Sequence, residues 1–372
     1  MTETVQRHFP NEVRQQPDAI RRTGEATSAL LETDEFTQLL GGVQRVVWTG
    51  SGDCYFIGSA IASFFEDFAG LPAVWVEAYD FVQNTPAIDE RSLVIGFSSS
   101  GKSVYTVDAI EKARRIGART LAIANKEDSR LQEAASASIL TRAGDSFSFP
   151  TKTSTSALLV GLLLAKQVGA LANWRAPDAV AVESIAQAMA DALDRVDQVA
   201  GAYAAGIATA RRTLVVGSGL GRTAAMLGAA KLIETSHVAT TACNCEEFLH
   251  LQGFGVNAED AVVVVHDGNR RSELAIEYAV SQGCHTIVID RGEAGLPDAA
   301  KIIELRGSGS SIVDMFSSIA ALHVLAAAVA QEKGTNPDIP AGVDLEYVIG
   351  LLYTDPVDGW NAAAAQGLPR EA

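Results

Sequence analysis

The sequence VVWTGSG at residues 46–52 is the strongest indication of the fold, because the chain repeats it as LVVGSG at residues 214–219. Ser218 in the second copy corresponds to Ser51 in the first. Two further apolar runs recur at almost the same interval, namely 93–96 as 262–265 and 121–123 as 287–289. Self-similarity at a nearly constant interval indicates a duplicated structural unit. The sequence therefore predicts two similar domains.

Each half reads as strand, glycine-rich turn, helix, strand, turn, helix and strand, and the strands are nearly continuous runs of Val, Ile and Leu. Such runs are typical of parallel strands that helices cover on both faces. We expect an α/β fold with two doubly wound sheets, whose ligands lie beyond the carboxyl ends of the strands. The apolar periodicity predicts helices at 55–68, 104–116, 156–172, 223–236 and 272–282.

Composition sets the domain boundaries. The stretch 173–178, with Trp174 and Pro177, interrupts the pattern before an alanine-rich helix that we expect at 182–204. We therefore expect an N-terminal helical segment, a first domain, a second domain and a C-terminal tail, at residues 1–40, 41–175, 176–335 and 336–372.

Composition also excludes several classes of protein. A net charge of −16, spread over 372 residues, repels phosphate backbones and anionic membranes, so we expect neither as a partner. The polar start is unlike a secretory signal, and the four cysteines include no CxxC pair, which together favour a reducing cytoplasm. The most apolar run, 319–330, is interrupted by His323 and is too short to cross a bilayer, so we expect a core helix there.

One predicted loop is rich in groups that bind anions. Residues 96–103 read GFSSSGKS, follow a strand of the buried type and open a helix. Serine hydroxyls, backbone amides and an ammonium group therefore meet at the positive end of a helix dipole, where phosphate binds. A helix cap alone needs one hydroxyl, whereas this loop carries three consecutive serines.

The same string satisfies the phosphate-loop pattern of NTPases, GxxxxGK[ST], and the run TIVID at 286–290 offers Asp290 as a magnesium ligand. Two features argue against an NTPase. The loop lies on the second strand of its half, and Asp290 belongs to the other half, whereas an NTPase keeps both in one sheet. Phosphate binding is expected under either interpretation.

Three motifs together resemble the sugar isomerase (SIS) domain family: SSSGKS at 98–103, TGSG at 49–52 and PTKTSTS at 150–156. The resemblance covers roughly residues 42–340. With the duplication, it implies two tandem SIS domains, each a flavodoxin-like parallel sheet sandwiched by helices. It also implies phosphate binding by the serine loop and nearby groups: Ser98, Ser99, Ser100, Ser103, Ser51, Thr151 and Lys152. Lys102 occupies a position where the family usually has an acidic residue. Its positive charge either strengthens the binding of an anion or is simply solvated at the start of the helix.

The second half has HDGNRR at 266–271 in place of the serine loop. The spacing between Glu234 and His250 resembles that of the family's catalytic pair. In that pair the glutamate moves a proton between neighbouring sugar carbons and the histidine assists ring opening. A partly desolvated carboxylate and an imidazole suit these steps near neutral pH. Lys231, one turn before Glu234, is a further candidate for substrate binding.

The same residues have ordinary structural interpretations. Glu234 and Lys231 could form an exposed helix pair worth roughly a few tenths of a kcal/mol. His250 could be a core histidine with satisfied hydrogen bonds. Cys243, Cys245 and His250 lack the spacing of a zinc site, so we expect no metal, and we expect no cofactor.

Two departures limit what the resemblance implies about the reaction. Leu227 stands where the family's synthase has an acidic residue, and no lysine follows Lys333, although that synthase has one in its tail. We also expect no glutamine-hydrolysing domain, because the first strand begins near Val46 and no cysteine precedes Cys54.

The resemblance implies an enzyme that acts through an enediol or enediolamine, either a sugar-phosphate aldose–ketose isomerase or an aminosugar-phosphate deaminase. Three alternatives stay open: an isomerase of a sulfonated sugar such as sulfoquinovose, a fructosamine-phosphate deglycase, and a non-catalytic sugar-phosphate sensor. The family further implies a homodimer with shared active sites, in which the histidine acts across the interface.

Overall fold

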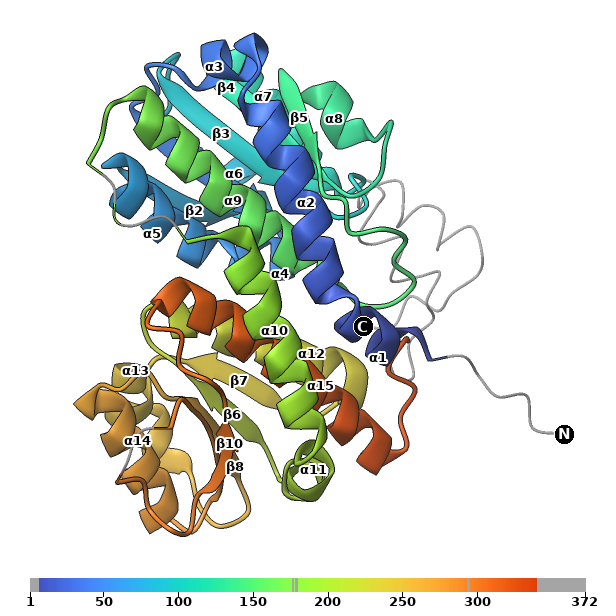
Figure 1. The fold of residues 1–372 in the computed structure, drawn as a ribbon, viewed down its shortest axis with the longest axis vertical. Helices are drawn as coiled ribbons and strands as arrows, with labels where there is room; N and C mark the ends of the chain where they lie inside the picture. The colour runs from blue at the N-terminus through green and yellow to red at the C-terminus, as the bar shows by residue number, and fades with distance from the viewer. Residues whose placement is uncertain (1–6, 176, 178–179, 293–294, 340–372) are drawn as a thin grey trace, which may run out of the picture.

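The computed structural model describes residues 7–339 apart from 176, 178–179 and 293–294. The predicted tail at 336–372 therefore lies almost wholly outside the described residues. The chain forms two lobes that follow one another along the long axis, with the first half of the chain in the upper lobe of Figure 1 and the second half in the lower lobe.

Each lobe contains a five-stranded sheet in which neighbouring strands are parallel. The first sheet has the order β2-β1-β3-β4-β5 and the second the order β7-β6-β8-β9-β10. In chain order both follow 2-1-3-4-5, the flavodoxin-like order. The strands are β1 (Arg45–Gly50), β2 (Ala73–Glu77), β3 (Ser92–Phe97), β4 (Arg119–Ala124), β5 (Ala137–Leu140), β6 (Thr213–Val216), β7 (Thr240–Cys243), β8 (Ala261–Val265), β9 (His285–Asp290) and β10 (Lys301–Glu304). The predicted α/β fold with two parallel sheets is confirmed.

Helices flank both sheets (Figure 1). Those of the first half are α1 (His8–Arg14), α2 (Gln16–Leu31), α3 (Asp34–Leu40), α4 (Asp53–Phe56), α5 (Gly58–Ala69), α6 (Ala78–Gln83), α7 (Val104–Ile116), α8 (Arg130–Ala134) and α9 (Lys152–Leu171). Those of the second half are α10 (Val182–Asp197), α11 (Ala200–Ala208), α12 (Leu220–Ser236), α13 (Cys245–His250), the 3₁₀ turn η1 (Gln252–Gly255), α14 (Arg270–Ser281) and α15 (Ser311–Lys333).

The two lobes share one hydrophobic core. A single cluster of buried side chains includes Phe64 on α5, Leu158 on α9 and Leu322 on α15. Helix α12 packs against α15 in its own lobe and against α4 and α5 of the first lobe. Gly228 permits the close approach of α12 to α15, because a Cβ atom there would lie 2.7 Å from Leu322 Cδ1. This packing holds α12, which carries Glu234, against the first lobe.

Helix α7 has its predicted bounds, and α12 and α14 begin three and two residues earlier than predicted. Three other helices depart further. Helix α9 begins at Lys152 because Thr151 takes the N-cap position, so the polar stretch predicted to precede the helix forms its first turns. The helix predicted at 182–204 is two helices, because Val199 leaves helical geometry with φ −121°. The helix predicted at 55–68 is likewise divided at Ile57 into α4 and α5.

By length and composition, α9 and α15 are both long and apolar enough to cross a membrane. The apolar run at 319–330 therefore belongs to a longer helix than predicted, one of 23 residues. However, 78% of the apolar window of α9 and 83% of that of α15 is buried inside the protein. Helix α15 packs against α10, α11 and α12, so the prediction of a core helix is confirmed.

Candidate active site

The carboxyl ends of β1 and β3 bring two candidate loops together. The strands are neighbours in the sheet, with Thr49 opposite Gly96. The turn that contains Ser51 therefore lies beside residues 98–103, which we call the serine loop. Ser51 is hydrogen-bonded within this edge, because its hydroxyl donates to Glu77 Oε1 over 2.6 Å.

The serine loop presents hydroxyl groups at the start of α7. Ser98 is buried and its Oγ lies 3.0 Å from Ser103 Oγ. Ser100 Oγ accepts a hydrogen bond from the backbone amide of Lys102, whose side chain is exposed. The N-terminus of α7 has no side-chain cap, so a bound anion has access to the positive end of the helix dipole.

Gly101 gives the serine loop its shape. Its φ of +67° lies in the left-handed region, and a Cβ atom there would lie 2.2 Å from Ser129 Oγ. The loop is also tied to its surroundings through backbone bonds from Asn125 to Ser99 and from Leu131 to Gly101. A side chain at residue 101 would therefore have to displace the loop or α8.

We expect Gly101→Ala to weaken phosphate binding and to lower the free energy of unfolding by about 1–3 kcal/mol, through left-handed strain and the clash with Ser129. Gly42→Ala is the matched control, because Gly42 has φ +72° but no atom within 4 Å of the added Cβ. Urea unfolding and calorimetric titration with fructose 6-phosphate measure both effects. Equal losses in the two variants would show that the contact with Ser129 is unimportant.

Thr151 and Lys152 begin α9 beneath the lobe's surface. The Oγ1 atom of Thr151 is buried and has no hydrogen-bond partner among the described residues. The Lys152 ammonium donates to Gln15 Oε1 at 2.5 Å and to the Asp145 carbonyl at 2.6 Å, and burial lowers the pKa of this lysine. Lys152 therefore connects the start of α9 to the N-terminal helices.

Lys231 joins the two lobes. Its ammonium is fully buried, lies 2.8 Å from Asp53 Oδ2 on α4 and also binds Glu234 Oε2 on its own helix. Asp53 in turn accepts a 3.2 Å hydrogen bond from Ser154 on α9. We call Asp53, Lys231 and Glu234 the ionic cluster. Because Lys231 is buried, the interpretation of Lys231 and Glu234 as an exposed helix pair is wrong.

Cys54 connects the ionic cluster to the serine loop. A Cβ atom built on Gly50 would lie 2.7 Å from Cys54 Cβ and 2.9 Å from the Phe97 carbonyl oxygen, so Cys54, which follows Asp53, lies beside the residue that precedes the serine loop. Burial, together with the charge of Asp53, raises the pKa of the Cys54 thiol to about 12, so the residue is an inert thiol. The carboxyl group of residue 234 and the anion-binding loop therefore belong to one site region.

The ionic cluster alters the acidity of its members. Burial raises the pKa of Glu234 to about 7, although the Lys231 ammonium opposes that shift. Burial acts to lower the pKa of Lys231, but the charges of Asp53 and Glu234 outweigh it and hold that pKa above its usual value. Glu234 can therefore both release and take up a proton near neutral pH, as an acid–base catalyst requires.

Within the described part of a single chain, His250 is not in contact with the ionic cluster. Its side chain is 76% exposed at the end of α13, and Nε2 lies 2.9 Å from Glu246 Oε2. Within the described residues no hydrogen bond or ion pair joins it to the ionic cluster. The interpretation of His250 as a core histidine is wrong. Leu251 and Phe254, which follow it, are exposed as well, by 66% and 75%.

A cavity of about 770 Å³ opens beside Glu234. Its lining includes Phe149 of the first lobe, Ile233 on α12, and His237 and Val238, which follow that helix. Arg212 and residues 239–241 complete the lining. The candidate base therefore borders a space lined by residues of both lobes, in which the apolar residues are Phe149, Ile233, Val238 and Ala239.

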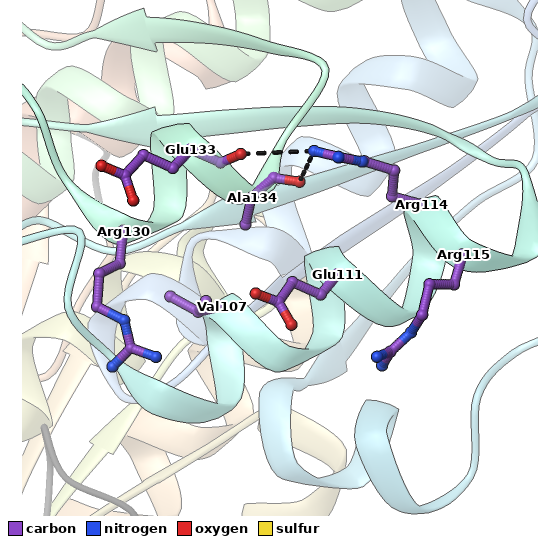
Figure 2. Close-up of a pocket in the computed structure, with 7 residues that line it drawn as sticks. All are labelled: Val107, Glu111, Arg114, Arg115, Arg130, Glu133 and Ala134. Carbon is purple, nitrogen blue, oxygen red and sulfur yellow. Dashed lines mark hydrogen bonds between the residues drawn. The ribbon is translucent and has the colours of Figure 1, made fainter.

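A second cavity, of about 310 Å³, lies on the first lobe between α7 and α8 (Figure 2). Its lining includes Arg114, Arg115 and Arg130, which would attract anions. However, Arg114 donates to the backbone carbonyls of Glu133 and Ala134, and the exposed Glu111 lies between the other two arginines (Figure 2). None of the candidate site residues lines this cavity.

The structure does not support an NTPase site. Asp290 ends β9 in the second sheet, and its Oδ1 lies 2.8 Å from His266 Nδ1. The serine loop follows β3 in the first sheet. The NTPase arrangement requires the loop and the acidic residue to lie at the ends of strands of one sheet. Here they lie at the ends of strands of two different sheets.

Comparison with known proteins agrees with the geometry of the first lobe. Residues 39–167 match the family model of the SIS domain. The first lobe is therefore similar to a SIS domain over these residues. The family model does not extend over the second lobe, which shares the strand order of the SIS domain, so a tandem pair of SIS domains stays a prediction.

The chain is similar beyond the SIS domain to isomerizing glutamine–fructose-6-phosphate aminotransferases. It is 29% identical over 356 residues to that of Yersinia pseudotuberculosis, covering 90% of this chain and 58% of the relative. The chain thus spans little more than half the length of this relative. Over 91% of the chain, the fold matches the C-terminal domain of the Francisella tularensis glucosamine–fructose-6-phosphate aminotransferase, with a TM-score of 0.82, 21% identity and complete coverage of that domain. It also matches a tagatose-6-phosphate ketose/aldose isomerase from Escherichia coli, with a TM-score of 0.70, 23% identity and coverage of 90% and 95% of the two chains.

Sequence reasoning missed Asp53. It follows the TGSG turn of the SIS domain directly, but nothing in that turn marks it as functional. Its partner Lys231 lies in the other half of the chain, so only the packing of α12 on α4 brings the two together. The excess of carboxylates over lysines in this acidic chain offers no signal for such a pair.

Proposed function

We propose that the protein isomerises or deaminates anionic sugars, with sugar phosphates as the preferred class. The observation that carries this proposal is the position of Glu234, a carboxyl group with a pKa of about 7 in an ionic cluster that adjoins the serine loop. The names of the relatives support phosphorylated hexoses as substrates. We expect the protein to act in the cytoplasm, without metal or cofactor.

In the proposed reaction the serine loop binds the phosphate. Ser98, Ser99, Ser100 and Ser103 provide hydroxyl or amide groups, and Lys102 adds a cation. The Glu234 carboxylate takes a proton from the carbon next to the carbonyl group, and the electron pair of the broken C–H bond becomes the C=C bond of an enediolate. A proton then passes from the neighbouring hydroxyl group to the former carbonyl oxygen. Glu234 then returns the proton to the neighbouring carbon. Ser51, Thr151, Lys152 and Lys231 would orient the sugar or the base.

We further propose that two chains share each site. His250 cannot act on a sugar beside Glu234 of its own chain without new contacts, because it is exposed and bound to Glu246. The exposed Leu251 and Phe254 beside it suit an interface with a second copy. In such a homodimer His250 would assist ring opening in the partner's site.

The cavity beside Glu234 favours a second candidate, a fructosamine-phosphate deglycase. A hexose phosphate is small and polar, whereas Phe149, Ile233 and Val238 line a space of about 770 Å³. Such a lining would accept the amino-acid substituent of a glycated amine. Proton transfer by Glu234 from the carbon that carries nitrogen to the neighbouring carbon would convert the ketoamine into an imine, and water would hydrolyse the imine to a sugar phosphate and the free amine.

A substrate panel tests the proposal. Hexose 6-phosphates, aminosugar phosphates, fructosamine phosphates and sulfoquinovose are incubated with the full chain and assayed for ketose, ammonia and free amino acid. We expect turnover of at least one phosphorylated member and none of unphosphorylated glucose, because the serine loop needs an anion. If sulfoquinovose is the only member that is turned over, the proposed substrate class would change from sugar phosphates to sulfonated sugars. If members of the panel bind but none is converted, the proposal that the protein is an enzyme would be overturned, and a sugar-phosphate sensor would be favoured.

A further inference from the structure

The ionic cluster contains a carboxylate to which no role has been assigned so far. Asp53 is 6% exposed, and its Oδ2 lies 2.8 Å from the Lys231 ammonium. Its other oxygen, Oδ1, is buried without a hydrogen-bond partner among the described residues. A buried carboxylate with so few partners is costly, and that cost indicates a function beyond packing.

Charge balance shows what Asp53 does to Glu234. With all three groups ionised, the ionic cluster carries one excess negative charge in a largely buried place. If Asp53 were absent, the single ammonium would neutralise Glu234 and hold it as a carboxylate. Because Asp53 shares the ammonium, the cluster becomes neutral when Glu234 takes a proton.

The surrounding charged groups do not provide this balance. Outside the ionic cluster, the buried titratable groups on the elements packed around α12 are His323 on α15, Cys54 on α4 and Cys243 on β7, and Arg212 and His237 line the cavity beside Glu234. The other titratable groups on these elements are exposed or only partly buried: Tyr55, Glu66, Asp67, Arg222, Asp314, Glu332 and Lys333. Burial holds the pKa of His323 well below its usual value, so that imidazole is neutral. Burial also raises the pKa of both cysteines to about 12, so they are neutral thiols. Arg212 lies 3.5 Å from the buried Asp260 and donates to the Gly255 carbonyl.

We propose that Asp53 is a positioning residue of the reaction: by sharing Lys231 with Glu234 across the lobe boundary, it keeps Glu234 able both to take a proton from the substrate and to return it. This inference rests on the proposed role of Glu234. The first lobe then contributes to the acid–base step as well as to anion binding, and separating the lobes would disable the base.

The test is a titration of Glu234 that does not depend on turnover. The carboxyl stretching band is followed by infrared difference spectroscopy against pH, and Glu234→Gln identifies the band. We expect a midpoint near pH 7 in the unaltered protein, as the pKa of Glu234 requires, and a midpoint at least one unit lower in Asp53→Asn. Asp67→Asn, an exposed aspartate on α5, should leave the midpoint unchanged.

An unchanged midpoint in Asp53→Asn overturns the inference, whatever the substrate proves to be. If Asp53→Asn does not fold, Asp53→Ser removes the same charge with a smaller side chain and is titrated instead. Where a substrate is known, Asp53→Asn should lower kcat about tenfold with KM within about twofold, and should move the acidic limb of kcat/KM to lower pH. Failure of the substrate panel alone would count against the proposed function and would leave the titration valid.

Discussion

Glu234→Gln is expected to lower kcat by a factor of about 10²–10⁴, the range that a positioned acid–base group contributes, while the dissociation constant for the sugar phosphate stays within about threefold. Glutamine keeps the volume of the side chain but cannot accept a proton from carbon. The Lys231 ammonium keeps its 2.8 Å contact with Asp53, so the fold should persist. Steady-state kinetics with the substrate found in the panel, and calorimetric titration, measure the two quantities.

Glu332→Gln is the matched control, because Glu332 is exposed near the end of α15 and belongs to no candidate site. It should leave kcat unchanged. Full activity in Glu234→Gln would remove Glu234 as the base and with it the proposed mechanism. A loss of binding without a loss of kcat would instead make Glu234 a ligand-binding residue.

Lys231→Met is expected to destabilise the protein by about 3–5 kcal/mol, because it leaves Asp53 and Glu234 facing each other without their buried cation. Methionine fills much of the same volume, so the loss reports the charge and not a cavity. Urea unfolding at pH 8, above the pKa of about 7 of Glu234, measures the largest effect. At pH 5 Glu234 is protonated and the loss should shrink, since one of the two repelling charges has gone.

Two comparisons make the result specific to the ionic cluster. Lys126→Met removes an exposed lysine 2.9 Å from Asp145, a surface pair that is worth roughly 0–1 kcal/mol. The triple variant Asp53→Asn, Lys231→Met, Glu234→Gln removes all three charges and should regain much of the lost stability. A loss below about 1 kcal/mol in Lys231→Met would mean that the cluster is not an energetically coupled unit.

The layered architecture could be predicted from local sequence patterns. Continuous Val, Ile and Leu runs such as 262–265 require cover on both faces, and the recurrence of the GSG turn predicted two sheets, which the structure contains. The serine loop was also predictable, because its hydroxyls, glycine and helix start are contiguous in the chain. Local properties of this kind survive in any tertiary context.

The surroundings of the candidate base could not be predicted, because they depend on contacts between distant parts of the chain. The burial of Lys231 and its contact with Asp53 depend on how α12 packs against α4 of the other lobe. The exposure of His250 depends on how α13 packs against α14. Periodicity could not predict them, since α12 is a mixture of small, apolar and polar residues without a clear polar face. Lys231 and Asp53 come from opposite halves of the chain, and burying their charges has a desolvation cost. That cost is offset only when the two lobes pack together, so no local sequence pattern encodes the contact.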